Sequence, residues 1–207
     1  MPNDALIARA QKMESHEHVS WDRWRDLHQP FELDWWREHH QENFADPAFT
    51  EKWAAIRQWI DAPAGPWLDI GCGPRPPFAP CTVIEPLAND YIAMVGMQWW
   101  KHVDISDGPA EKRVEELQGR FASVSCWNAL DHMIGWREAL ANMAFYAKDD
   151  GVISLSVDFQ GPFLGHPGVP EAEFRAEVRK LFTLTNYGEP AIDGRMSAMR
   201  LCKQISK

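Results

Sequence analysis

A short apolar segment that runs directly into a glycine-rich loop is the feature that most constrains the fold of this chain. Trp67-Leu-Asp-Ile70 is followed at once by Gly71-Cys-Gly-Pro74, and a second apolar segment ends at Glu85. Glycines at the carboxyl end of a strand let the backbone approach a bulky ligand, and a carboxylate at the tip of the next strand can accept both hydroxyls of a ribose. The pattern therefore predicts a site for a nucleoside-containing small molecule.

The overall composition limits the class of protein. The chain has 207 residues, 45% of them hydrophobic, which is enough for one sizeable core but few for two. Its formal net charge is -9 and it contains no basic run, so nucleic acid is not an expected partner. The N-terminus lacks the apolar core of a signal peptide, and no apolar run approaches the roughly 18 residues of a membrane span. We expect a cytoplasmic protein with no membrane partner.

The composition changes at about residue 61. Residues 1–61 are rich in Trp, His, Glu and Arg and contain no glycine. Apolar side chains there recur at spacings of three and four, as at Trp53, Ile56 and Ile60, which predicts helices. We therefore predict a helical extension or lid over residues 1–61, followed by one compact domain over residues 62–207.

After Pro66 the chain alternates short apolar strands with helices, the pattern of a mostly parallel sheet covered on both faces. The last two strands, 181–187 and 196–204, are joined without a helix and should pair as an antiparallel hairpin. We predict an α/β fold with a seven-stranded sheet. The other expected strands are 67–70, 82–85, 100–104, 121–127 and 152–157, and the expected helices are 87–97, 109–118, 136–147 and 170–180.

Five segments, in their order along the chain, carry a resemblance to one enzyme family. The first reads Leu68-Asp-Ile-Gly-Cys-Gly-Pro74, and the second ends in Glu85. Together they resemble the motifs of the class I S-adenosylmethionine-dependent methyltransferases, which have a Rossmann-like fold. The resemblance covers residues 66–204. Its segments are 68–74, 82–86, 109–111, 121–132 and 146–155.

The resemblance implies S-adenosylmethionine as the cofactor and assigns residues to it. The glycine loop would lie along the methionine and ribose, Glu85 would bind the ribose hydroxyls, and the segment at Ala110 would flank the adenine. Asp69 would contact the cofactor or instead tie down the loop through backbone N–H groups. The expected cofactor-binding residues are Asp69, Gly71, Cys72, Gly73, Glu85, Pro86, Ala110, Glu111 and Asn128.

The segment after the glycine loop departs from the family pattern. Arg75-Pro-Pro77 stands where a third small residue is common, and only sixteen positions separate Asp69 from Glu85. Prolines at 76, 77 and 80 leave room for at most a turn or two of helix. We predict a truncated first crossover helix, with the Phe78 ring packed where that helix would have continued.

Three residues are candidates for a catalytic role. Methyl transfer depends mainly on orientation, and a base is needed only when the acceptor arrives protonated. His132, just past the fourth strand, is the candidate base, and its alternatives are a helix cap or a place in the adenine pocket. Asp131 is expected at a helix N-terminus rather than as a base. Asp158 and His166 follow the fifth strand and form either an acceptor-binding acid and base or a structural turn.

The spacing of histidines and cysteines does not indicate a metal site. His16 with His18, and His39 with His40, are not three or four residues apart, as helical metal ligands usually are. The four cysteines form no CxxC pair. We therefore expect no metal.

The expected activity is methyl transfer to the oxygen or nitrogen of a small-molecule acceptor, with Trp-rich helices as a lid on which a planar acceptor can stack. An RNA or protein methyltransferase is an alternative, disfavoured by the negative charge and by Asn128-Ala-Leu-Asp131 in place of an Asn-Pro-Pro-Tyr-type motif. A cofactor-binding protein without methyl transfer is another. A nicotinamide dehydrogenase is disfavoured because Pro76 takes the last position of the G-x-G-x-x-G pattern.

Overall fold

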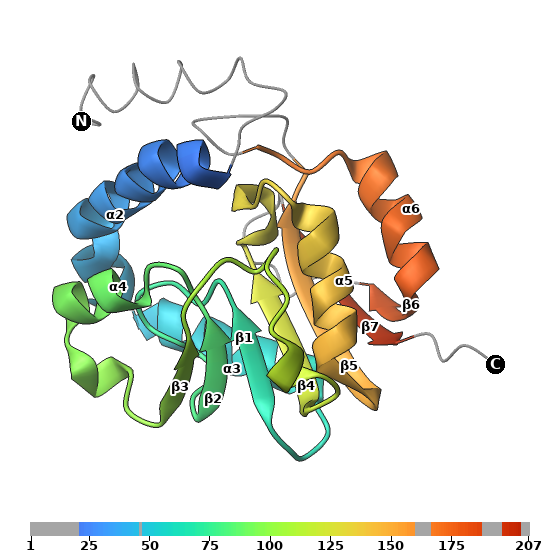
Figure 1. The fold of residues 1–207 in the computed structure, drawn as a ribbon. Coiled ribbons are helices and arrows are strands. Elements are labelled where there is room, and N and C mark those ends of the chain that lie inside the picture. Colours follow the sequence, from blue (N-terminus) through green and yellow to red (C-terminus); the bar gives the residue numbers. More distant parts are fainter. Residues whose placement is uncertain (1–20, 46, 160–166, 188–195, 204–207) are drawn as a thin grey trace.

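A computed structural model shows one mixed sheet of seven strands with helices around it (Figure 1). The structure describes residues 21–45, 47–159, 167–187 and 196–203. The order across the sheet is β3-β2-β1-β4-β5-β7-β6. The strands are β1 (Trp67–Ile70), β2 (Cys81–Ile84), β3 (Val103–Ser106), β4 (Phe121–Trp127), β5 (Ala147–Asp158), β6 (Phe182–Tyr187) and β7 (Met196–Lys203).

The strand pairing confirms the predicted α/β architecture. β3, β2, β1, β4 and β5 pair in parallel, whereas β7 pairs antiparallel with both β5 and β6. The mostly parallel sheet and its terminal hairpin are therefore both as predicted. Because the parallel strands point the same way, the loops that follow β1, β2 and β4 meet at one edge of the sheet.

The helices agree with the predicted ones in most places. They are α2 (Trp21–Ala45), α3 (Pro47–Ile60), α4 (Ala88–Val95), α5 (Trp136–Tyr146) and α6 (Glu171–Leu181), with short 3-10 turns η1 (Met97–Trp99), η2 (Glu115–Leu117) and η3 (Leu130–His132). α2 and α3 confirm the helical character of the N-terminal extension over its described part. Among the described residues, no helix has both the length and the apolar composition needed to cross a bilayer.

The helix predicted over residues 109–118 is wrong, because only the short turn η2 forms there. The amide nitrogen of Asn142, a residue of α5, donates to the carbonyl oxygens of Ala110 and Glu111 at 2.8 and 3.0 Å. A side chain from another element thus binds the carbonyls that a helix would use internally. Such a tertiary contact leaves no trace in the local periodicity.

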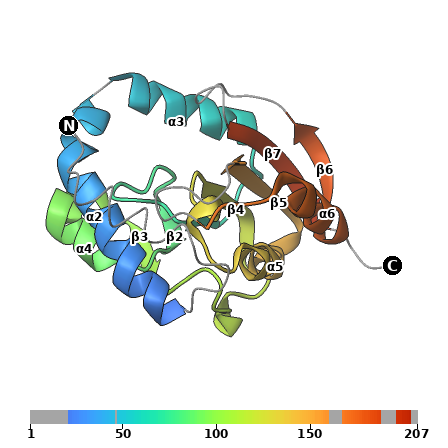
Figure 2. The same ribbon diagram turned by 90° about the horizontal axis from the view of Figure 1, so that it is seen from above.

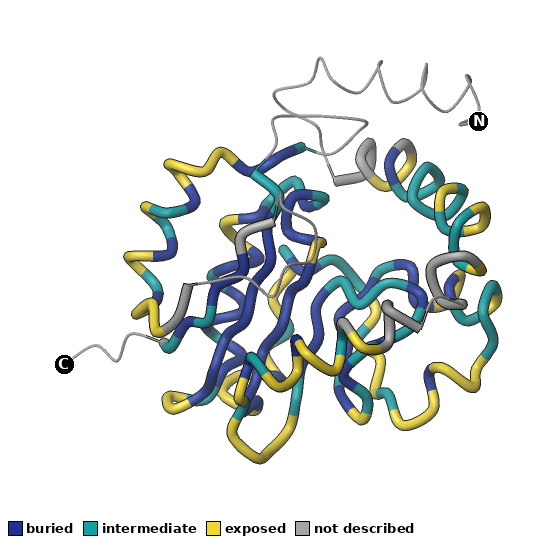
Figure 3. Tube along the Cα trace, turned by 180° about the vertical axis from the view of Figure 1, so that it is seen from behind, coloured by how far each residue is buried: buried dark blue, intermediate teal, exposed yellow. Residues whose placement is uncertain are grey.

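Alternate residues of the central strands face two different helix layers, as the two-residue period of a strand requires. Leu68, Val124 and Ile153 belong to the core cluster shared with α5 and α6, whereas Trp127 and Val152 belong to the cluster shared with α3. Figure 2 shows α3 on the opposite side of the sheet from α5 and α6. The central strands are buried between these layers (Figure 3).

The crossover from β1 to β2 contains no helix at all, so the predicted truncated helix is wrong. Residues 71–80 form only turns and bends, because prolines remove the N–H donors that a helix needs. The expected burial of Phe78 is confirmed: its ring is fully buried, stacks on Trp67 at 4.6 Å, and lies edge-on to Trp53 of α3. Helix α3 therefore supplies the layer that the crossover lacks.

Candidate active site

The glycine loop turns sharply at the carboxyl edge of the sheet. Gly71 and Gly73 have φ angles of 70° and 65°, in the left-handed region that glycine favours. A Cβ on Gly71 would lie 2.4 Å from the Cβ of Ala129, so a larger residue would push the loop away from the end of β4. The Gly71 N–H also donates to the carbonyl of Ile84 at 3.0 Å. The loop is thereby held between the ends of β2 and β4.

The carboxylate of Glu85 lies directly against this loop. One oxygen accepts the N–H of Gly73 at 3.3 Å, and the other accepts the N–H of Leu87 at 3.0 Å. The residue is only 5% exposed, and burial raises the pKa of its carboxyl to about 7. Two acceptor positions remain on the carboxylate after these hydrogen bonds, because an ionised carboxylate offers about four.

Asp69 lies within β1 and is bound to the neighbouring strand β4. Its Oδ1 accepts a hydrogen bond from the Ser125 hydroxyl at 2.8 Å, and the indole N–H of Trp67 donates to the same hydroxyl oxygen at 2.9 Å. Burial raises the pKa of Asp69 to about 7. Its hydrogen bonds therefore join β1 to β4, and the described contacts include none from its carboxylate to an N–H of the glycine loop.

The unusual segment after the loop is fixed by two aromatic residues. The indole N–H of Trp100 donates to the carbonyl of Pro74 at 3.0 Å. The guanidinium of Arg75 lies 3.7 Å from the ring centroid of Trp99. These contacts hold the start of the crossover without a helix.

Helix α2 runs along the carboxyl edge of the sheet, on the side of α4 (Figure 1). A Cβ on Gly73 would lie 3.7 Å from Cζ2 of Trp36, so this indole lies next to the glycine loop. The indole N–H donates to Oε1 of Glu32 at 2.9 Å. The N-terminal extension thus places an aromatic ring and a carboxylate beside the loop and beside Glu85.

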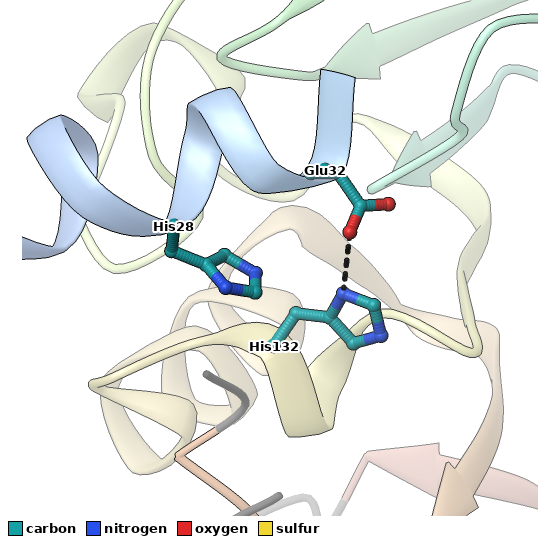
Figure 4. Close-up of side chains that lie close together, drawn as sticks. All are labelled: His28, Glu32 and His132. Carbon is teal, nitrogen blue, oxygen red and sulfur yellow. Dashed lines mark ion pairs between the residues drawn. The ribbon is translucent and has the colours of Figure 1, made fainter. Parts of the chain in front are cut away.

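His132, at the end of η3, points toward α2 (Figure 4). Its Nδ1 is 3.4 Å from Oε2 of Glu32, and its Nε2 is 3.7 Å from Oδ2 of Asp131. Burial by itself would lower the pKa of His132, but the carboxylates of Glu32 and Asp131 raise it to about 9. These carboxylates therefore favour the protonated ring, which must lose its proton before it can act as a base.

The other predicted cofactor residues lie in the loops that meet at this edge. Cys72 is half-buried in the glycine loop, and burial beside Glu85 raises the pKa of its thiol well above the ordinary value, so the thiol is neutral. Asn128 directly follows β4, is exposed, and has a φ of 53°. Pro86 follows Glu85 before α4. Ala110 is buried after β3, and Glu111 accepts the N–H of Gly135 at 3.2 Å.

Of the three catalytic candidates, the structure describes His132 and Asp158. Asp158 is the last residue of β5 and lies opposite Met196 of β7 in the strand register. His166 lies outside the described residues, as do His16 and His18. Only His132 is described in contact with the N-terminal extension.

The sequence did not single out His28 or Glu32 for the site, whereas Trp36 is one of the tryptophans of the predicted lid. These three residues are each four apart, so they lie on one face of α2. The signal in the sequence is a histidine followed by a glutamate one helical turn later, at His28 and Glu32. Their meeting with His132 depends on where α2 lies, which no local pattern specifies.

Comparisons with known proteins agree with this geometry. A family model described as a methyltransferase domain matches residues 36–191. A search of curated proteins finds no match. The crystal structure of the Burkholderia thailandensis 1,6-didemethyltoxoflavin-N1-methyltransferase, with 1,6-didemethyltoxoflavin and S-adenosylhomocysteine bound, is similar at 16% identity and a TM-score of 0.64, over 93% of this chain and 94% of that chain.

Two further solved structures share the fold. A TehB-like S-adenosylmethionine-dependent methyltransferase from Corynebacterium glutamicum has 15% identity and a TM-score of 0.61, over 81% of this chain and 98% of that chain. The glycopeptide N-methyltransferase MtfA has 13% identity and a TM-score of 0.57, over 75% of this chain and 90% of that chain. Because the family model spans well over half of the chain, the protein belongs to the class I S-adenosylmethionine-dependent methyltransferases, with S-adenosylmethionine as its cofactor.

Proposed function

We propose that this methyltransferase transfers the methyl group to an oxygen or nitrogen atom of a small-molecule acceptor. The observation that carries the proposal is the position of α2: Glu32 reaches His132 at 3.4 Å, and Trp36 lies beside Gly73. Side chains from the extension therefore border the edge of the sheet where the cofactor loop lies. An acceptor there has to fit among side chains, which favours a small molecule over a polymer.

The residues at the sheet edge fit the cofactor. Glu85 keeps acceptor positions for the two ribose hydroxyls, and the left-handed glycines at 71 and 73 allow close approach of the backbone. When bound, S-adenosylmethionine supplies a methyl group on a positively charged sulfur, which needs no further activation. The protein then contributes mainly by holding the acceptor in line with that methyl group.

Charge and similarity support a small acceptor. The net charge of -9 repels the phosphate backbone of RNA. The similar Burkholderia thailandensis enzyme acts on a small molecule according to its name, and the likeness extends over 93% of this chain. In our proposal His132 and Glu32, which contact each other at 3.4 Å, bind and orient the acceptor, and Asp158 and His166 stay candidates for a second acid and base.

Two experiments test the proposal in sequence. Calorimetry with S-adenosylmethionine, S-adenosylhomocysteine and NAD should show binding of both adenosyl ligands and none of NAD. The protein is then incubated with methyl-labelled cofactor and a cell extract fractionated into small molecules, RNA and protein. Label in the small-molecule fraction supports the proposal, whereas label in RNA or protein, or cofactor binding with no labelled product, contradicts it.

A further inference from the structure

Three side chains that can bind a metal converge between α2 and the end of β4. His28 and Glu32 are one helical turn apart on α2, and His132 ends η3. Each offers one ligand atom, and these atoms all lie within 4.8 Å of one another. Figure 4 shows the three side chains directed toward a common point. We propose that His28, Glu32 and His132 form a mononuclear site for a divalent transition-metal cation of the zinc class.

The distances suit such a site. Zinc bonds to nitrogen and oxygen of about 2.0–2.2 Å place two ligand atoms of a tetrahedral site about 3.3 Å apart. Oε2 of Glu32 and Nδ1 of His132 are already 3.4 Å apart. Every other ligand pair lies within 4.8 Å, so each closes to the tetrahedral distance by moving about 1.5 Å at most, which side-chain rotation provides.

Neighbouring polar side chains orient two of the ligands. Metal-binding histidines commonly present their second ring nitrogen to a carboxylate, which fixes the ring and raises its basicity. His132 has this arrangement: Nδ1 faces Glu32, and Nε2 is 3.7 Å from Oδ2 of Asp131. Trp36 donates its indole N–H to Oε1 of Glu32 at 2.9 Å, which leaves Oε2 directed at His132.

Burial and charge favour a cation at this point. His28 is 1% exposed, and the side chains of Glu32 and His132 are each 19% exposed, so a bound ion would be largely shielded from water. Asp131 and Glu85 add negative charge near His132. Two imidazoles and one carboxylate suit zinc, cobalt, nickel and ferrous iron better than magnesium or calcium, which prefer oxygen ligands.

A metal bound there would join the extension to the catalytic domain. Three protein ligands leave one position of a tetrahedral site for water or another donor, the arrangement of zinc sites that bind a substrate. If the proposed function holds, an oxygen or nitrogen of the acceptor would take that position. Metal binding itself does not depend on the proposed function and is measured without acceptor or cofactor.

The test uses the full chain, stripped with a chelator and then titrated with Zn²⁺ by calorimetry and with Co²⁺ by visible absorption. We expect one ion per chain and the intense absorption of a cobalt ion with fewer than six ligands. His28→Ala and Glu32→Gln should each weaken Zn²⁺ binding by about 100-fold or more, because each removes a ligand. Asp131→Asn should weaken it by about 10- to 100-fold, as loss of an orienting partner does.

Other histidines of α2 and of the N-terminal segment provide matched controls. His39 and His40 bind carbonyl oxygens of their own helix through Nδ1, at 2.7 and 2.9 Å, so His39→Ala and His40→Ala should leave Zn²⁺ binding unchanged. A His16→Ala, His18→Ala double variant should also bind one ion. Circular dichroism checks that each variant is folded. Absence of Zn²⁺ binding in the wild type, or equal binding in folded His28→Ala or Glu32→Gln, would overturn the inference.

Discussion

Glu85 connects the glycine loop after β1 to the start of the segment that follows β2. Its carboxylate accepts an N–H from Gly73 on one side and from Leu87 on the other, while the residue is 5% exposed. A buried carboxylate in this position has a structural task and keeps acceptor capacity for a ligand. Substitution of Glu85 tests the ligand-binding task through affinity and the structural task through stability.

Replacing Glu85 by Ala should weaken S-adenosylhomocysteine binding by more than tenfold, because both ribose hydroxyls lose a charged acceptor. Calorimetry measures the change. Glu116→Ala is the control, since Glu116 is exposed in η2, before β4. Equal affinities of the Glu85→Ala variant and the wild type would show that the ribose binds elsewhere.

Glu85 should also make stability depend on pH. Burial, with Glu32 and Asp69 nearby, raises its pKa from 4.5 in the unfolded chain to about 7 in the fold. The folded state then holds the proton more tightly, so the contribution of Glu85 to the unfolding free energy is largest below pH 4.5 and declines as pH rises to about 7.

Urea unfolding of the wild type and of Glu85→Gln at several pH values measures this contribution. The pKa of Asp69 is raised by its burial rather than by Glu85, so Asp69 should contribute alike in both proteins and the difference between them isolates Glu85. The wild type should lose more stability than the variant between pH 5 and pH 7. Parallel curves would mean that the carboxyl of Glu85 titrates alike in the folded and unfolded chain.

At the scale of elements, α3 replaces a crossover helix. Ile56 and Ile60 of α3, Phe78 of the crossover and Trp127 of β4 form one buried cluster. The helix, which ends at Ile60 shortly before β1 begins at Trp67, thus comes from the N-terminal extension instead of from the chain that follows β1. The N-terminal extension differs in composition from the rest of the chain, but through α3 it forms part of the hydrophobic core.

Phe78→Ala should lower the unfolding free energy by about 3–5 kcal/mol, because the ring is fully buried and its loss leaves a cavity between the sheet and α3. Urea denaturation measures this. Met97→Ala serves as the control, since Met97 is 63% exposed and should change stability by less than about 0.5 kcal/mol. A change in Phe78→Ala as small as in the control would show that α3 does not depend on this ring.

At the scale of the whole molecule, the cofactor loop, the end of β4 and α2 form one connected unit. Trp36 borders the glycine loop, and Glu32 and His28 border His132. Helix α6 makes its main described contacts with α5 and β6 rather than with α2 or the glycine loop. A ligand at the loop should therefore stabilise α2 more than α6.

Hydrogen exchange with and without S-adenosylhomocysteine tests this connection. At 100 times its dissociation constant, a ligand stabilises the state that binds it by about 2.7 kcal/mol, and exchange slows in segments whose opening disrupts the site. We expect slower exchange in residues 71–74 and in α2, with little local change in α6. Protection of residues 71–74 with no change in α2 would contradict the coupling.

The sequence by itself determined the mostly parallel sheet with its antiparallel hairpin, the glycine loop and the acid at Glu85, and it placed the strands approximately: the third lies at 103–106 where 100–104 was predicted. Those features rest on local patterns: two-residue alternation, glycine positions, and a link too short for a crossover. Tertiary structure decided the rest. The loop at Ala110 is held open by Asn142, Phe78 is covered by α3, and His28 and Glu32 meet His132 only because α2 folds back over the sheet edge. Contacts between residues distant in the sequence depend on how whole elements pack, which no local spacing records.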